Sequence, residues 1–388
     1  MKNIYYDNAA TTKVDDRVIA EMIPFYTEHF ANPHAVHSQG QIALDAVEKA
    51  RETVAKFFNC ENQEIIFTAG ATEGNNIAIQ GVVNKFKENI HIICSAIEHP
   101  SVLETCREMK KRGVKIDYVP VDENGVVLVG KLQKLIKSNT VLVSVMYANN
   151  EVGSVQPIKE IGELIKTENE KRDKKLPLYF HTDAVQAVNY LDCDVSELNC
   201  DFLTMSGHKI NGPKGIGAMF IKKGVKFSPV QFGGHQEFGV RPGTANVPGI
   251  VGLAKAIELI SSEGKADFKK VKKVRDKLVK EISKIDNIKI NCDLSTSLPN
   301  ILNVSFLKAE GESILMMLDM EGIAISTGSA CSSGSLEPSH VLSAMGRKPE
   351  WSHGSIRISL SKFNSEVEVA VFIKALSVVI EKLRKMAP

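Results

Sequence analysis

Lys209, a lysine shortly after an apolar run, is a residue whose type and position could support catalysis. Lys209 ends the stretch 206–209, which follows the run 202–205 and contains Ser206 and His208, and a Gly-rich segment comes next at 212–217. In a dry pocket a lysine loses its preference for the ammonium form, because burial disfavours the charge. Its free amine can then condense with an aldehyde. Taken alone, Lys209 is weak evidence, since most lysines are exposed.

A second segment, residues 181–186, supplies a carboxylate. Asp183 comes shortly after the apolar run 178–180. The aldehyde cofactor pyridoxal phosphate (PLP) withdraws electrons only while its pyridine nitrogen stays protonated, and a buried carboxylate holds that proton. Gln186 could bond the phenolic oxygen of the same ring. Asp183 and Lys209 together therefore predict a PLP site.

A turn of small residues at 68–76 leads from the apolar run 65–67 into a predicted helix. Backbone N–H groups at a helix N-terminus bind phosphate, which makes Ala71 and Thr72 the expected cradle. His99 follows another apolar run and could stack its ring on a pyridine. Taken singly, the turn is a weak signal, and a histidine in such a place is more often a helix-entry residue.

The seven cysteines are scattered, and none forms a C-x-x-C pair. We therefore expect no metal site and no redox disulfide, and we interpret six of the cysteines as small buried hydrophobes. Cys331 is the exception. It lies in a segment of Gly, Ser, Thr and Ala, residues 326–335, which offers almost no apolar surface for packing.

The elements that must position these segments follow a regular pattern. Short apolar runs rich in β-branched residues alternate with helix-length amphipathic stretches. Such strands, separated by helices, indicate a parallel sheet covered on both faces, which is an α/β domain. The expected strands are 65–67, 92–94, 116–119, 141–145, 178–180 and 202–205, and the expected helices include 43–58, 101–111 and 158–171.

The pattern changes in the last third of the chain, which indicates a smaller α+β domain. In order, we expect a polar interruption at 261–267, a Lys-rich helix at 268–285, a strand at 301–306 and a closing helix at 367–385. The predicted division is a large PLP-binding domain, 15–261, and a small domain formed by 1–14 and 262–388. The small domain would carry the Cys331 loop, at about 326–337.

Composition narrows the classes of partner. Lys and Arg number 48 against 46 Asp and Glu, a formal net charge of +2, and long blocks of like charge do not occur. Nucleic acid and membrane surfaces are therefore not expected partners. The N-terminal segment is polar and no apolar run is long enough to span a bilayer, so we expect a cytoplasmic protein.

The order and spacing of these motifs resemble the class-V aminotransferase family of fold-type I PLP enzymes, and within it the cysteine desulfurases of the NifS and IscS type. The resemblance covers nearly the whole chain and includes further motifs at 7–12, 32–33, 149–153, 241–244 and 299–306. It implies the fold-type I architecture, PLP as the cofactor and a homodimer.

The resemblance also implies roles for single residues. Lys209 would hold PLP as a Schiff base and move the Cα proton, Asp183 would bond the ring nitrogen, and His99 would stack on the ring and act in acid–base steps. Gln186 and Asn150 would lie near the ring. The implied phosphate ligands are Thr72, Ser206 and His208 and, from the other subunit, Thr244.

For the reaction, the resemblance implies that sulfur passes from L-cysteine to Cys331 as a persulfide, with release of L-alanine. Arg357, on a predicted strand, would clamp the substrate carboxylate with its planar guanidinium, and Asn32 would assist. The persulfide would then serve an acceptor protein such as an iron–sulfur scaffold, because the long form of the Cys331 loop resembles that of the general iron–sulfur assembly enzymes. A tRNA-thiolation protein and a nitrogen-fixation system stay open as other acceptors.

Three alternatives stay open. A class-V aminotransferase has no need of Cys331 in such a loop, and the sequence does not discriminate a selenocysteine lyase from an enzyme that acts on sulfur. A catalytically silent sulfur-transfer scaffold would have no physical use for Lys209, Asp183 and Arg357. One departure from the family pattern stands at 235–238, where relatives usually show a third Gly and an Arg.

Overall fold

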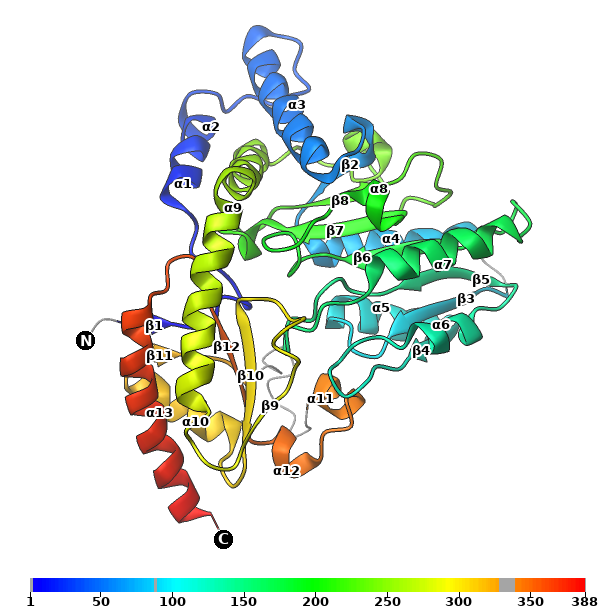
Figure 1. The fold of residues 1–388 in the computed structure, drawn as a ribbon. Coiled ribbons are helices and arrows are strands. Elements are labelled where there is room, and N and C mark those ends of the chain that lie inside the picture. The colour runs from blue at the N-terminus through cyan, green and yellow to red at the C-terminus, as the bar shows by residue number, and fades with distance from the viewer. Residues whose placement is uncertain (1–2, 87–88, 328–338, 388) are drawn as a thin grey trace.

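The structure is a computed structural model that describes residues 3–86, 89–327 and 339–387. In this part of the chain seven strands form a central sheet with helices on both faces (Figure 1). Five neighbouring strands run parallel, and β8 is antiparallel to both strands beside it, which confirms the predicted mainly parallel sheet. In spatial order the strands are β2 (Ile65–Thr68), β8 (Gly217–Ile221), β7 (Phe202–Ser206), β6 (Tyr179–Asp183), β5 (Thr140–Ser144), β3 (His91–Ser95) and β4 (Lys115–Val119).

Alternating side chains of the strands enter two separate cores, one on each face of the sheet. In β2, Ile65 and Phe67 pack with α3, α7 and the first part of α9, whereas Ile66 packs with α4 and α5. Burial on both faces explains why these strands are continuous apolar runs in the sequence. The helices of this part are α1 (Asp16–Met22), α2 (Pro24–Thr27), α3 (Ser38–Phe58), α4 (Ala71–Phe86), α5 (Pro100–Lys111), α6 (Val129–Leu135), α7 (Ile158–Glu170), α8 (Val195–Leu198) and α9 (Val247–Ile282).

A further core lies beside the sheet and is built from both ends of the chain (Figure 1). Strand β1 pairs in parallel with β11, and Tyr6 packs edge-on against Phe372 with ring centroids 5.4 Å apart. The division into two domains at the predicted boundaries stays a prediction. The elements of this core are β1 (Ile4–Tyr5), β9 (Ile288–Ile290), β10 (Ile301–Phe306), α10 (Gly311–Met320), β11 (Ile323–Ala324), β12 (Ser355–Ser359) and α13 (Glu366–Met386). Helix α11 (His340–Ala344) packs instead in a core on the sheet through Val341 and Leu342, and the short helix α12 (Pro349–Ser352) follows it.

Helix α9 corrects one expectation from the sequence. The polar stretch 261–267 does not precede a new helix, because it lies inside α9, a single helix of 36 residues. Its first part packs in the core on the sheet through residues such as Leu253, and its last part packs in the further core through Val271 and Leu278. The stretch is polar because there the helix passes from one core to the other, and its side chains are exposed or half-buried.

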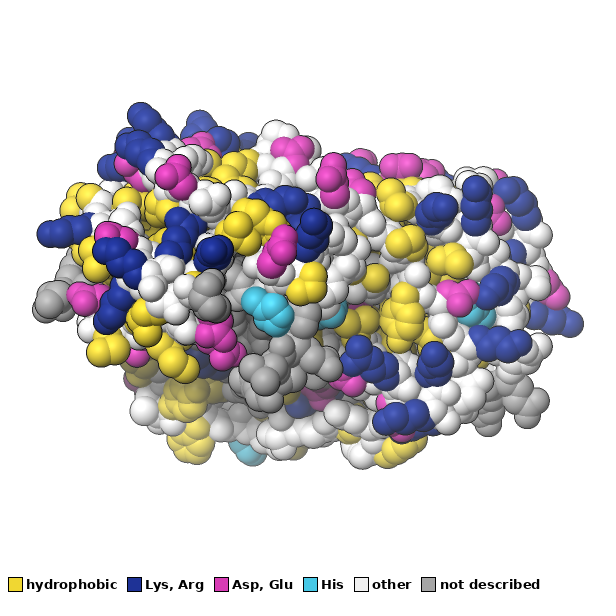
Figure 2. Space-filling view, turned by 90° about the horizontal axis from the view of Figure 1, so that it is seen from below, with side chains coloured by type: hydrophobic (Ala, Val, Ile, Leu, Met, Phe, Trp, Pro, Cys, Tyr) yellow, Lys and Arg dark blue, Asp and Glu magenta, His cyan; other side chains and the backbone are white. Residues whose placement is uncertain are grey.

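The surface agrees with the balanced composition. On the face shown in Figure 2, Lys and Arg side chains are interspersed with acidic and hydrophobic side chains. No helix within the described ranges is long and apolar enough to cross a membrane.

Candidate active site

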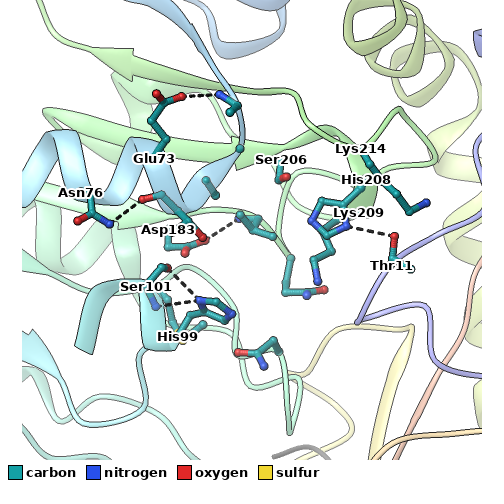
Figure 3. Close-up of a pocket in the computed structure, with 18 of the residues that line it drawn as sticks. Thr11, Glu73, Asn76, His99, Ser101, Asp183, Ser206, His208, Lys209 and Lys214 are labelled. Carbon is teal, nitrogen blue, oxygen red and sulfur yellow. Dashed lines mark hydrogen bonds between the residues drawn. The ribbon is translucent and has the colours of Figure 1, made fainter. Parts of the chain in front are cut away.

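The carboxyl ends of the parallel strands open into a cavity of about 1020 Å³ (Figure 3). This is the edge at which α/β sheets bind their ligands. The segments that line it come from both ends of the chain, and include residues 9–11, the start of α4, the start of α5 and one residue of β12. The cavity brings together most of the predicted site residues: Ala71, Thr72, His99, Asn150, Asp183, Gln186, Ser206, His208, Lys209 and Arg357.

Three predicted site residues are not part of this group. Asn32 is exposed, and its side chain accepts the backbone N–H of His34 at 3.0 Å. Thr244 is exposed and does not line the cavity of its own chain, while its predicted place is the cavity of a partner subunit. Cys331 lies in the segment 328–338, which is outside the described residues.

Asp183 forms the buried end of β6. Its Oδ2 accepts a hydrogen bond from Asn75 Nδ2 at 2.8 Å, and its Oδ1 accepts the backbone N–H of Val185 at 3.0 Å. Asn75 is itself wholly buried and accepts the hydroxyl of Thr204 at 2.5 Å. These bonds fix the orientation of the carboxylate at the cavity. There it can accept a hydrogen bond from the protonated nitrogen of a pyridine ring.

His99 is the cap of α5 and projects into the cavity (Figure 3). Its Nδ1 accepts the backbone N–H of Ser101 at 3.1 Å and lies 2.9 Å from the Ser101 hydroxyl. Burial lowers the pKa of His99 below its ordinary value, and Lys209 adds to this effect while Asp183 opposes it. The imidazole is therefore neutral at neutral pH.

Lys209 stands in the short helical turn that follows β7 (Gly207–Lys209). Its Nζ donates hydrogen bonds to the carbonyl oxygens of Ala9 at 2.5 Å and Ala10 at 2.7 Å. The sequence alone assigns no role to the motif at 7–12. In the structure its backbone forms the side of the cavity that positions the Lys209 amine.

The start of α4 and the end of β7 form a polar rim. Ala71 and Thr72 occupy the first positions of α4, where backbone N–H groups have no partner within the helix. Ser206 and His208 line the same cavity. Burial lowers the pKa of His208 to about 4, and the charge of Lys209 adds to the shift, so that the ring is neutral. Helix N–H groups beside hydroxyls suit a phosphate.

Arg357 reaches the cavity from β12. It is 3% exposed, and it donates from Nη2 to Asp7 Oδ1 at 2.8 Å and from Nη1 to the Asn150 carbonyl at 3.0 Å. Its Nε is buried without a hydrogen-bond partner. A buried guanidinium with one unsatisfied N–H is suited to accept a ligand carboxylate. Asp7, which orients it, was not among the predicted site residues.

The residues present fit PLP. The cavity holds an amine that would take the aldehyde, a buried carboxylate that would bond the ring nitrogen, a neutral imidazole that would lie beside the ring and a helix N-terminus that would bind the phosphate. Lys209, Asp183, His99 and Thr72 are the residues that would serve these four tasks.

The segment 235–238, where the chain departs from the family pattern, is firmly anchored. The two oxygens of Glu237 accept hydrogen bonds from Arg51 Nη1 and Nη2, both at 2.9 Å, and one also accepts the Phe67 N–H at 2.8 Å. Glu237 and Phe238 have φ angles of 45° and 56°, which lie in the left-handed region. A bidentate buried ion pair therefore holds a strained turn whose residues do not line the cavity.

The family comparison matches nearly the whole chain. The model of the class-V aminotransferases matches residues 4–372. A cysteine desulfurase IscS of Clostridium botulinum is 46% identical over 392 residues, which cover 100% of this chain and 96% of the relative. The cysteine desulfurase IscS of Methanosarcina thermophila is 45% identical over 389 residues, with 100% and 94% covered.

Solved structures agree with this. A NifS-like protein superposes with a TM-score of 0.91 at 41% identity, over 98% of this chain and 100% of that one. A NifS-like protein from Rickettsia africae gives a TM-score of 0.86 at 31% identity, again over 98% and 100%. A structure titled SspA in complex with cysteine gives a TM-score of 0.82 at 34% identity, over 93% and 99%.

Proposed function

Because the chain belongs to the class-V aminotransferase family and is a PLP-dependent cysteine desulfurase, we propose that it converts L-cysteine to L-alanine and passes the sulfur to Cys331. The observation that carries the proposal is a single cavity that holds Lys209, Asp183, His99 and Arg357 together. A similar solved structure whose title names bound cysteine supports the choice of substrate.

Arg357 binds the carboxylate of the substrate. The Arg357 side chain on β12 is fixed by its bonds to Asp7 and to the Asn150 carbonyl. Its Nε has no hydrogen-bond partner. A carboxylate bound to a guanidinium in a buried site makes short, charge-assisted hydrogen bonds with defined geometry. The clamp therefore orients the Cα–H bond and the sulfur of the substrate relative to the other cavity residues.

Lys209 moves the Cα proton. Bound PLP supplies an electron sink for the negative charge that develops at Cα when this proton leaves. Asp183 keeps the proton on the pyridine nitrogen, and Gln186, whose Nε2 donates to the Ala9 carbonyl at 3.2 Å, lies beside it in the cavity. We assign the proton transfer to Lys209 because an amine in this cavity is a suitable general base.

Cys331 acts on sulfur, and the sequence alone supports this step. Its thiolate attacks the sulfur of L-cysteine, so that an S–S bond forms and the substrate C–S bond breaks. The electron pair of the broken bond stays on the carbon, which is protonated and leaves as the methyl group of alanine. His99 faces this chemistry from the start of α5, and Cys331 keeps the sulfur as a persulfide.

We propose further that the persulfide serves an acceptor protein such as an iron–sulfur scaffold. The relatives named cysteine desulfurase IscS support this assignment. The active form would be a homodimer in which the exposed Thr244 of each chain completes the phosphate site of the other.

The test is incubation of the purified holoenzyme with L-cysteine and a thiol reductant, followed by measurement of sulfide and alanine in the same sample. We expect the two products in a 1:1 ratio. A keto acid in place of alanine would contradict the proposal in favour of an aminotransferase, and no product would indicate a silent scaffold. A parallel incubation with L-selenocysteine decides whether the site discriminates between sulfur and selenium.

A further inference from the structure

A chain of hydrogen bonds joins Asp183 and His99, the two cavity residues that would contact the cofactor ring. The Thr204 hydroxyl donates to Asn75 Oδ1 at 2.5 Å, and Asn75 Nδ2 donates both to Asp183 Oδ2 and to Ser101 Oγ at 2.8 Å. Ser101 Oγ in turn lies 2.9 Å from His99 Nδ1. The reaction assigned above uses Asp183 and His99 but gives no role to the residues that connect them.

The chemistry of the groups fixes the direction of each bond. A carboxylate accepts hydrogen bonds and does not donate them, so Asn75 must present its NH₂ group to Asp183. The same NH₂ group donates to Ser101 Oγ, which leaves the Ser101 hydroxyl proton for another acceptor. The backbone N–H of Ser101 donates to His99 Nδ1, so this nitrogen carries no proton. The Ser101 hydroxyl therefore also donates to His99 Nδ1.

Two donors on Nδ1 decide where the neutral ring keeps its single proton. The proton is on Nε2, at the edge of the His99 ring that is turned away from Ser101 (Figure 3). The ring therefore offers an N–H to the cavity and has no free lone pair there. A ring in this state can donate a hydrogen bond to sulfur but cannot take a proton from it.

We propose that Ser101, oriented by Asn75, is a positioning residue that fixes His99 in its Nε2-protonated tautomer, so that His99 stabilises the substrate sulfur as a hydrogen-bond donor instead of deprotonating it. This inference deepens the proposed function and rests on it. A thiolate is stabilised by a nearby N–H. The proton of the substrate thiol consequently leaves by a route that does not include His99.

The charged groups around the ring set the background for a test. Asp183 on β6 favours the imidazolium form, whereas Lys209 after β7 and His340 at the start of α11 disfavour it. The bonds from Ser101 act in the same direction as Lys209 and His340, because protonation at Nδ1 would break both bonds. Removal of the Ser101 hydroxyl should therefore raise the pKa of His99.

The experiment is an NMR titration of holoenzyme that carries ring-¹⁵N-labelled histidine, with the His99 signals assigned by their loss in His99→Gln. In the wild type we expect the Nε2-protonated tautomer at neutral pH. In Ser101→Ala we expect the pKa of His99 to rise by about one unit, the size of one hydrogen bond, with some Nδ1-protonated tautomer. Ser101→Thr, which keeps the hydroxyl, should restore the wild-type titration.

Thr105→Val is the matched control. The Thr105 hydroxyl is buried on the same helix and bonds the Ser101 carbonyl at 2.7 Å, but it does not touch His99. This variant should titrate as the wild type does. A wild-type ring protonated on Nδ1, or a Ser101→Ala ring that titrates as the wild type does, would overturn the inference. The titration does not depend on turnover, so a protein that releases no sulfide contradicts the proposed function and leaves this result intact.

Discussion

Two sides of the active-site cavity differ in how completely their polar groups are bonded. The floor, which we define as Asp183, Asn75 and Thr204, is buried, and each of its side chains has a partner within the same sheet and helix layers. The substrate wall, which we define as Arg357 and Asp7, is bonded to the Asn150 carbonyl and keeps one buried guanidinium N–H without a partner.

The difference teaches which side holds a permanent ligand and which a transient one. Closed networks of buried hydrogen bonds are rigid and hold a resident cofactor in one position. An unsatisfied buried donor is costly for the free protein, and this cost is relieved only when a ligand supplies an acceptor. We therefore expect changes in the floor to disturb the cofactor, and changes in the substrate wall to disturb L-cysteine binding alone.

The largest expected effect comes from Lys209 and Cys331, the two residues that we propose make covalent bonds. Lys209→Ala and Cys331→Ser should each lower sulfide release by at least about 10³-fold, since each removes a group for which the site has no substitute. Only Lys209→Ala should abolish the borohydride-reducible attachment of PLP, which is measured by mass spectrometry after reduction. A reducible attachment at another lysine, or near-normal sulfide release by Cys331→Ser, would refute the assignments.

The substrate wall is tested by Arg357→Ala. The loss of charge-assisted bonds should lower kcat/KM for L-cysteine by about 10²-fold, mostly through KM, while the PLP content stays normal. The floor variant Asn75→Leu should instead lower PLP content and kcat. Arg384→Ala is the control, because Arg384 bonds backbone carbonyls away from the cavity. If Arg357→Ala lost PLP as readily as Asn75→Leu, the contrast between the two sides would fail.

The dimer is tested by mixing two inactive partners. If Thr244 acts on the cavity of the other subunit, a heterodimer of Lys209→Ala and Thr244→Ala chains contains one site with both lesions and one intact site. Each heterodimer should then have about half the activity of a wild-type dimer, and an equimolar mixture, in which random exchange makes about half of the dimers heterodimers, should rise to about a quarter of the wild-type sulfide release. A mixture that stays as weak as the separate variants would place Thr244 in its own chain's function or in none.

The smallest expected effect concerns a buried carboxyl below the cavity. Glu98 is 1% exposed, and burial raises its pKa to about 8. The folded protein thus binds this proton more tightly than the unfolded chain, so the contribution to stability is full below about pH 4.5 and is lost as the pH rises to about 8. Glu98→Gln should remove this loss. The difference in apparent Tm between the variant and the wild type should therefore be a few degrees more favourable to the variant at pH 9 than at pH 5.

Its control is Glu108→Gln on the exposed side of α5. The pKa of Glu108 is lowered by its hydrogen bond with Arg112, so its contribution is lost only under acid conditions. The variant should therefore match the wild type between pH 5 and 9. A Glu98→Gln protein with the same pH dependence as the wild type would show that Glu98 is already ionised in the folded state.

The sequence predicts those site residues that stand at the ends of strands. Lys209 and Asp183 follow apolar runs, and the carboxyl ends of parallel strands meet at one edge of a sheet, so their convergence follows from the pattern. Asn75 and Ser101 were missed, although Asn75 lies in the turn 68–76 and Ser101 begins the expected helix 101–111. Their roles depend on contacts between α4, α5 and β6, and periodicity carries no information about which polar side chains meet there.

Helix α9 shows that composition alone can also predict a break in a helix where none exists. A polar stretch at 261–267 has the composition of a linker, and only the packing of both ends of the helix reveals that it continues. The position of Thr244 illustrates a related limit, because a residue that serves another subunit carries no distinguishing signal within its own chain. Asn32 is exposed and lies outside the cavity residues of its own chain. These two assignments stay predictions.

The parallel pairing of β1 with β11 has a consequence for biosynthesis. Ile4 pairs with Ile323, and at a ribosomal rate of about 5 to 20 residues per second the roughly 320 residues between them take about 15 to 65 seconds to appear. The backbone N–H of Ala9, whose carbonyl bonds Lys209, is held by the hydroxyl of Ser359. The sheet can therefore fold during translation, whereas the cavity becomes complete, and competent to retain its cofactor, only after the last strand has left the ribosome.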